Sequence, residues 1–161
     1  MNYVAIIGDL PPKPVVIVLS ALAKVYPKWT PFFMPHPVSP GRIWKNEQVR
    51  KEFTSGRRTE MGLDGSNQKF CLGTALGLLN ALKAVREEVI PGLTVPFFVV
   101  HGTQDEGVPI AGTEYLLEHA STPESDRLTR IIDGGYHCIF SEDDKEETAK
   151  AMIDWMNEKA T

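Results

Sequence analysis

Apolar strands and helices alternate along residues 95–161, and this alternation constrains the fold most. Residues 95–100 form a continuous apolar run with Pro96 near its start, which is typical of a strand buried on both faces. Residues 110–120 predict a helix, residues 128–132 a second apolar strand, and residues 143–159 a terminal helix. In the terminal helix, the apolar face consists of Ala149, Met152, Ile153 and Met156. Strand, helix, strand, helix is the pattern of a parallel α/β sheet, so we predict an α/β fold.

Composition excludes several classes of protein. The chain has 161 residues, enough for one ordinary domain, and its 42% hydrophobic and 24% charged residues exclude disordered and fibrous proteins. Lys and Arg number 17 against 21 for Asp and Glu, a net charge of −4. Nucleic-acid binding needs a basic face to neutralise phosphates, so we expect no nucleic-acid partner.

The first ninety residues carry weaker signals. Residues 3–7 are a short apolar run that predicts a strand. The β-branched residues 15–18 favour a strand, but the helical spacing of apolar residues over 15–26 favours the helix that we predict. Between 27 and 73, prolines interrupt regular structure, leaving a brief helix at 46–53 and a loop at 56–67. This segment is either a lid or a surface excursion. Residues 74–89 predict a helix with one apolar stripe, made of Leu78, Leu79, Leu82 and Val85.

Polar loops follow the two predicted strands of the C-terminal region. Asp105 lies five positions after residue 100, and His137 lies five positions after residue 132. A right-handed crossover brings both loops to the same edge of the sheet, and neighbouring strands are only about 4.8 Å apart. A hydrogen bond from Asp105 to His137 is therefore easy to form. Imidazole exchanges a proton near neutral pH, and a carboxylate behind it fixes the ring tautomer. The alternative is a capping aspartate and a surface histidine.

The residues around this pair resemble those of a known family. The run Val-Pro-Phe-Phe-Val-Val-His-Gly-Thr-Gln-Asp at 95–105, followed by Gly-Tyr-His at 135–137, is similar to the C-terminal half of α/β-hydrolases. The most similar group is the monoacylglycerol lipase-like family, also described as serine aminopeptidase S33-like or Hydrolase 4, with lysophospholipases and plant caffeoylshikimate esterases among its members. The resemblance implies that Asp105 is the acid and His137 the base of a Ser-His-Asp triad.

The resemblance also implies a division of the chain and a class of substrate. Residues 1–10 would be a strand of the hydrolase core, 11–73 a cap, and 74–161 the C-terminal core with the acid and base. The substrate would be a small-molecule or lipid carboxylic ester. In the cap, an aromatic group would either touch an acyl chain or lipid, allowing peripheral membrane contact, or pack within the cap: Trp29, Phe32, Phe33 and Met34.

A nucleophile is missing from this pattern. The triad order in this fold is Ser, Asp, His, with the serine in a G-x-S-x-G turn. None of the serines before Asp105 has glycine two positions away on both sides: Ser20, Ser39, Ser55 and Ser66. We therefore expect a truncated hydrolase whose isolated chain is inactive. The alternative is a non-catalytic hydrolase-like protein that binds a ligand or a partner chain.

Other sites are not indicated by the sequence. The four histidines, His36, His101, His119 and His137, lack metal-ligand spacing, so we expect no metal and no cofactor. We interpret His101 as a packing or loop residue. Cys71 and Cys138 form no CxxC pair and indicate reduced intracellular thiols. Residues 1–10 lack a basic leader, and the longest apolar stretch, 15–23, is too short to span a bilayer. We expect a cytoplasmic or peripheral membrane protein.

Overall fold

The computed structural model describes residues 12–33, 40–53, 55, 69–141 and 143–160. The strand predicted at 3–7 and the loop predicted at 56–67 lie outside the described residues. The principal elements, in chain order, are the helices α2 (Lys13–Val25), α3 (Pro40–Ile43), α4 (Glu47–Phe53) and α6 (Leu72–Ala84), the strand β1 (Phe97–Gly102), the helix α7 (Ala111–His119), the strand β2 (Arg127–Ile132) and the helix α8 (Lys145–Lys159). The predicted strand–helix–strand–helix order of the C-terminal region is confirmed.

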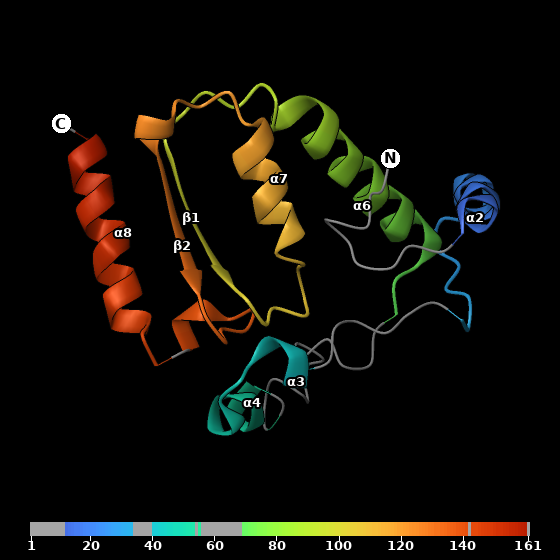
Figure 1. Ribbon diagram of the computed structural model, residues 1–161. Coiled ribbons are helices and arrows are strands. Elements are labelled where there is room, and N and C mark those ends of the chain that lie inside the picture. The colour runs from blue at the N-terminus through green and yellow to red at the C-terminus, as the bar shows by residue number, and fades with distance from the viewer. Residues whose placement is uncertain (1–11, 34–39, 54, 56–68, 142, 161) are drawn as a thin grey trace.

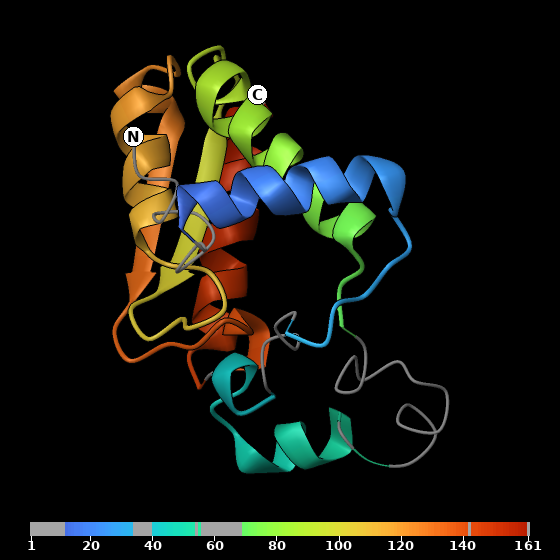
Figure 2. The same cartoon turned by 90° about the vertical axis from the view of Figure 1, so that its right-hand side faces the viewer.

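A parallel pair of strands forms the centre of this region. β1 and β2 pair in register from Phe97 opposite Arg127 to Gly102 opposite Ile132. Helix α7 covers one face of the pair and α8 covers the other (Figures 1 and 2). Alternate side chains of β1 follow this division: Phe98 packs against Trp155 of α8, whereas His101 hydrogen-bonds to Thr113 of α7. His101, on the face towards α7, therefore lies at the end of β1, close to the loop that carries Asp105.

The prediction that the first strand is buried on both faces is wrong for most of its length. Residues 97–100 are half-buried, and only His101 and Gly102 are fully buried. The reason is that the described part of the sheet has two strands, which one helix on each face covers incompletely (Figure 1). Burial on both faces requires neighbours on both sides of a strand as well as helices above and below.

Helix α8 has the predicted position, but only part of its predicted apolar face is covered. Thr148 is fully buried, and Trp155 packs near Phe98 with ring centroids 6.0 Å apart. Of the four residues predicted on one apolar face, Ala149 and Met152 are half-buried, whereas Ile153 and Met156 are 52% and 50% exposed.

A separate small core joins α2 to α6. Ala23 of α2 and Leu72 of α6 are buried there, surrounded by partly buried residues of both helices: Leu19, Leu22, Ala75 and Leu76. The helix predicted over 15–26 is thereby confirmed as α2. Leu78 and Val85 of the predicted stripe remain 45% and 39% exposed, because contact with α2 involves the first turns of α6. The predicted helix over 74–89 continues past α6 as one π-helical turn, Val85–Val89.

Helices α3 and α4 lie near the carboxyl ends of the two strands (Figure 1). The indole of Trp44, between them, stacks on Phe53 with ring centroids 4.3 Å apart. The brief helix predicted at 46–53 is confirmed as α4. These helices therefore place part of the predicted cap beside the loops that follow β1 and β2.

Candidate active site

The loop after β1 holds the Asp105 carboxylate in a fixed orientation. Its side chain is only 6% exposed. Oδ1 accepts hydrogen bonds from the amides of Gly107, at 2.7 Å, and Val108, at 2.8 Å. An aspartate that binds the backbone of its own loop in this way is held in a single rotamer. Its second oxygen, Oδ2, is left to accept a hydrogen bond from another group.

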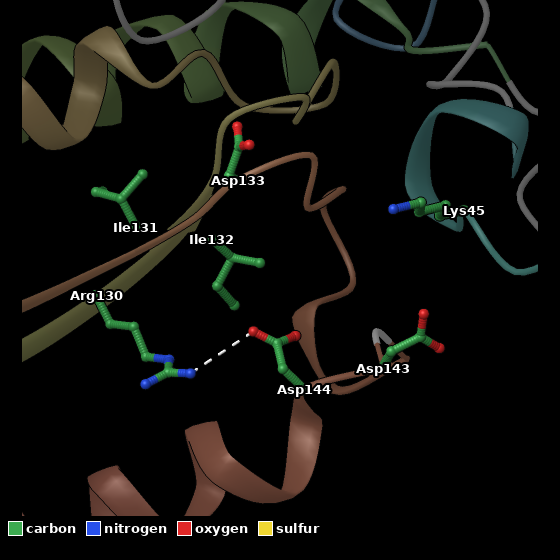
Figure 3. Close-up of a pocket in the computed structure, with 7 residues that line it drawn as sticks. All are labelled: Lys45, Arg130, Ile131, Ile132, Asp133, Asp143 and Asp144. Carbon is green, nitrogen blue, oxygen red and sulfur yellow. Dashed lines mark ion pairs between the residues drawn. The ribbon is translucent and has the colours of Figure 1, made fainter.

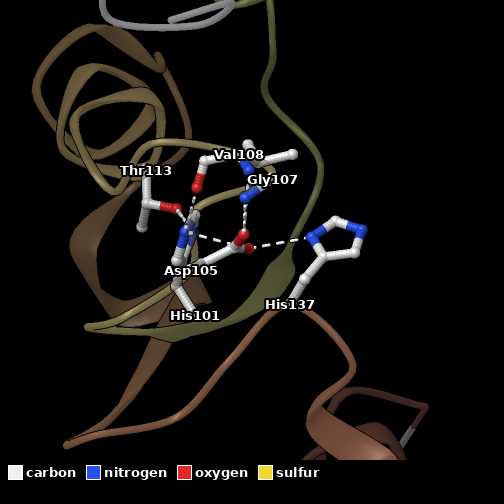
Figure 4. Close-up of polar contacts among 6 residues, drawn as sticks. All are labelled: His101, Asp105, Gly107, Val108, Thr113 and His137. Atoms are coloured by element: carbon white, nitrogen blue, oxygen red, sulfur yellow. Dashed lines mark hydrogen bonds and ion pairs between the residues drawn. The ribbon is translucent and has the colours of Figure 1, made fainter. Parts of the chain in front are cut away.

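His137 supplies that group from the loop after β2. Its Nδ1 lies 2.9 Å from Asp105 Oδ2 (Figure 4). Since an ionised carboxylate only accepts hydrogen bonds, Nδ1 carries the proton and donates it. Nε2 of the neutral ring is then free to accept a proton, and the side chain is 43% exposed. The structure thus brings the two residues predicted as acid and base into direct contact, in the tautomer that base catalysis needs.

Backbone hydrogen bonds join the two loops. The amide of Thr103 donates to the carbonyl of Ile132, and the amide of Gln104 donates to the carbonyl of Gly135, both at 2.9 Å. Gly134 has φ +67°, a left-handed conformation that glycine adopts without strain. A Cβ atom on Gly102 would lie 2.2 Å from the Gly135 carbonyl oxygen, so only glycine permits this approach. The spacing between Asp105 and His137 follows from these contacts.

The end of α3 and the residues that follow it also contact both loops. Arg42 forms an ion pair with Glu106, the residue after the acid. The amide of Cys138, the residue after the base, donates to the Ile43 carbonyl at 3.0 Å. Lys45 Nζ lies 3.4 Å from the Gly134 carbonyl oxygen. The sequence does not reveal this role for residues 42–45, because no periodicity or motif signals a contact across more than 60 positions.

A polar hollow of about 290 Å³ lies beside the carboxyl end of β2 (Figure 3). Its lining excludes Asp105 and His137 and consists of Lys45, Arg130, Ile131, Ile132, Asp133, Asp143 and Asp144. Arg130 faces Asp144 at 3.6 Å and Glu147 at 3.1 Å, so its charge is already paired. The hollow is therefore separate from the candidate acid–base pair.

The aromatic residues predicted to contact substrate lie on the surface. Trp29, Phe32 and Phe33 are 47%, 88% and 53% exposed. The rings of Phe32 and Phe33 meet edge to face, with centroids 5.4 Å apart. Met34 lies outside the described residues. These side chains present apolar surface to solvent. None of them belongs to the hydrogen bonds that hold Asp105, which come from the loops after β1 and β2.

Two further findings concern only the described part of the chain. Over those residues, no group of three His, Cys, Asp or Glu side chains could hold a metal ion. No helix among them is long and apolar enough to cross a membrane.

Comparison with known proteins shows the family. The model of the serine aminopeptidase S33 family, Hydrolase_4, matches residues 3–144. The chain belongs to this hydrolase family. The expected membership is therefore confirmed, and the Asp105–His137 pair lies inside the matched region.

Several lipases are similar to this S33-family hydrolase. The monoacylglycerol lipase of Mycolicibacterium smegmatis is 24% identical over 139 residues, which cover 86% of this chain and 46% of that protein. The monoglyceride lipase of Rattus norvegicus is 35% identical over 74 residues, covering 46% of this chain and 23% of that protein. The chain thus spans about half, or less, of the length of the curated relatives it matches.

Solved structures establish the fold of this family member. The monoacylglycerol lipase of Paleococcus ferrophilus superposes with a TM-score of 0.70 at 18% identity, covering 90% of this chain and 52% of that one. A monoglyceride lipase variant from Saccharomyces cerevisiae gives a TM-score of 0.66 at 17% identity, covering 91% and 49%. The fold is a partial α/β-hydrolase fold, as predicted.

Proposed function

We propose that Asp105 and His137 are the acid and base of a Ser-His-Asp triad that hydrolyses carboxylic esters of the monoacylglycerol or lysophospholipid type. The observation that carries this proposal is the 2.9 Å contact between His137 Nδ1 and a carboxylate that is almost completely buried. The family match supports a hydrolase, and the lipase relatives favour an ester as its substrate. The proposal assigns residues 11–73 to the cap and residues 74–161 to the core that holds the pair.

The geometry fits the base chemistry of such a triad. His137 Nε2 accepts the proton of an attacking serine hydroxyl and later donates it to the leaving alcohol. Asp105 holds the ring in the Nδ1–H tautomer and stabilises the imidazolium that forms between these steps. The 43% exposure of His137 leaves its ring accessible to a nucleophile and a substrate.

The nucleophile of this triad is not within the 161 residues. Because no serine before Asp105 lies in a G-x-S-x-G turn, we place the nucleophile outside this sequence and propose that the isolated chain is inactive. The missing motif also favours a second candidate, a non-catalytic hydrolase-like protein that binds an apolar ligand or a partner chain. In both cases, the exposed aromatic residues of the cap would contact apolar ligand or a membrane surface: Trp29, Phe32 and Phe33, together with Met34.

A chimera tests the enzyme proposal. The part of the Mycolicibacterium smegmatis lipase that precedes the matched region is joined to this chain, and hydrolysis of a monoacylglycerol is measured. We expect hydrolysis by the chimera and none by the chain alone. Asp105→Asn in the chimera should lower turnover by up to about 10⁴-fold, because the wrong tautomer of His137 becomes favoured.

Labelling by a fluorophosphonate probe provides the control, since it reports an activated serine without a lipid substrate. The isolated chain should remain unlabelled, and labelling of any of its serines would contradict the placement of the nucleophile outside it. An active chimera in which Asp105→Asn retains a near-normal rate would remove Asp105 from the triad. A folded chimera without hydrolysis or labelling would favour the binding protein.

A further inference from the structure

A buried histidine lies behind the candidate acid, on the side opposite His137. His101 is 7% exposed, and its Nε2 lies 2.9 Å from the carbonyl oxygen of Val108. A carbonyl oxygen only accepts hydrogen bonds, so Nε2 must carry a proton. In the neutral ring, Nδ1 is then an acceptor, and the Thr113 hydroxyl, at 2.7 Å, donates to it. The carbonyl of Val108 therefore selects the Nε2–H tautomer of His101, and the hydroxyl of Thr113 holds the other ring nitrogen.

This histidine is linked to the acid by hydrogen bonds through Val108, in addition to a direct approach of 3.5 Å. Val108 accepts from His101 with its carbonyl and donates with its amide to Asp105 Oδ1, at 2.8 Å. The carboxylate cannot rotate about its own bonds without breaking this amide contact, and its other oxygen is the partner of His137. Figure 4 shows these contacts, from Thr113 to His137, and the direct approach of His101 to Asp105. They connect helix α7 to the base without direct contact between His101 and His137.

We propose that His101 and Thr113 are positioning residues for Asp105 and that together they keep His137 in the Nδ1–H tautomer. This inference rests on the proposed function, because it needs Asp105 and His137 to act as a pair. His101 Nε2 also lies 3.5 Å from Asp105 Oδ2. A ring turned away from Val108 could therefore compete with His137 for that oxygen. The hydroxyl of Thr113 prevents the turn by holding the opposite nitrogen.

The tautomer of His137 in the full 161-residue chain tests the proposal. Long-range ¹H–¹⁵N spectra distinguish the Nδ1–H and Nε2–H forms. Thr113→Val removes the hydroxyl at nearly constant volume, and Thr113→Ser is its matched control. His101→Leu removes both ring contacts, whereas the amide of His101→Gln can still accept from Thr113 and donate to Val108. Amide spectra and far-UV circular dichroism verify that each variant is folded.

We expect Thr113→Val and His101→Leu to shift the Nδ1–H to Nε2–H ratio of His137 by about fivefold towards Nε2–H, the factor for one lost hydrogen bond between neutral groups. Thr113→Ser and His101→Gln should preserve the wild-type ratio. A purely packing role predicts the opposite order for His101, since Leu packs at least as well as Gln. Preservation of the Nδ1–H form in Thr113→Val, or its loss in Thr113→Ser and His101→Gln, would overturn the inference.

Asp105→Asn separates this inference from the proposed function. If Asp105→Asn leaves the tautomer of His137 unchanged, the pair itself does not exist in solution and both proposals fail. If Asp105→Asn changes the tautomer while Thr113→Val and His101→Leu do not, the acid–base pair remains and only the positioning role is refuted.

Discussion

Replacement of Gly102 by alanine should open the contact between the two loops of the candidate active site. The new Cβ would lie 2.2 Å from the carbonyl oxygen and 2.4 Å from the carbonyl carbon of Gly135, both belonging to rigid backbone. Since real Cβ contacts essentially never fall below 3.0 Å, the oxygen must recede by at least 3.0 − 2.2 = 0.8 Å. The same oxygen accepts from the Gln104 amide at 2.9 Å, so the movement threatens that hydrogen bond as well.

Both effects lower the free energy of unfolding. Overpacking of a rigid site costs about 1–3 kcal/mol, and the loss of one backbone hydrogen bond costs about 0.5–1.5 kcal/mol. We therefore expect Gly102→Ala to destabilise the chain by about 2–4 kcal/mol. The movement also carries the loop of His137 away from Asp105, so the Nδ1–H form of His137 should decrease in the same variant.

Urea unfolding, followed by far-UV circular dichroism, measures the first effect. Gly77→Ala in helix α6 is the matched control, because nothing lies within 4 Å of its new Cβ. That control should gain about 0.5–1 kcal/mol, the usual preference of a helix interior for alanine. Stability of Gly102→Ala within about 0.5 kcal/mol of the wild type, at unchanged m-value, would refute the steric argument.

Three further changes test contacts elsewhere in the fold. Thr122→Val should lower the free energy of unfolding by about 1–2 kcal/mol, because the fully buried hydroxyl of Thr122 donates to two carbonyls of the segment that leads into β1. An unchanged urea midpoint would contradict this. Arg127→Met should lower the free energy of unfolding by about 2–3 kcal/mol, because the guanidinium donates to three carbonyls at and beyond the end of α7. An unfolding temperature equal to that of the wild type would exclude this role. A hydrogen bond with the Thr74 hydroxyl lowers the pKa of Cys71. Thr74→Val should therefore raise the pH at which alkylation of Cys71 reaches half its maximal rate. Identical rate–pH curves for the variant and the wild type would disprove this role of Thr74.

The local pattern was sufficient to predict the elements that carry the site. The apolar runs around β1 and β2 and the helices between and after them were identified because periodicity reflects burial within a few residues of chain. Asp105 and His137 could be paired for the same reason, since loops after adjacent parallel strands meet at one edge. Errors arose where burial depended on distant partners, as for Ile153 on α8 and Leu78 on α6.

The sequence by itself determined the parallel α/β character of residues 95–161, the family and the two residues of the candidate acid–base pair. Only the tertiary structure decided that Oδ1 of Asp105 faces the amides of its own loop and Oδ2 faces His137. It also showed that His101, interpreted from the sequence as a packing or loop residue, is buried and hydrogen-bonded at both ring nitrogens. The physical reason is that hydrophobic periodicity encodes which residues are buried, whereas a hydrogen bond depends on the relative placement of atoms within a few tenths of an ångström. That placement is set by contacts such as the approach of Gly102 to Gly135, which no local pattern records.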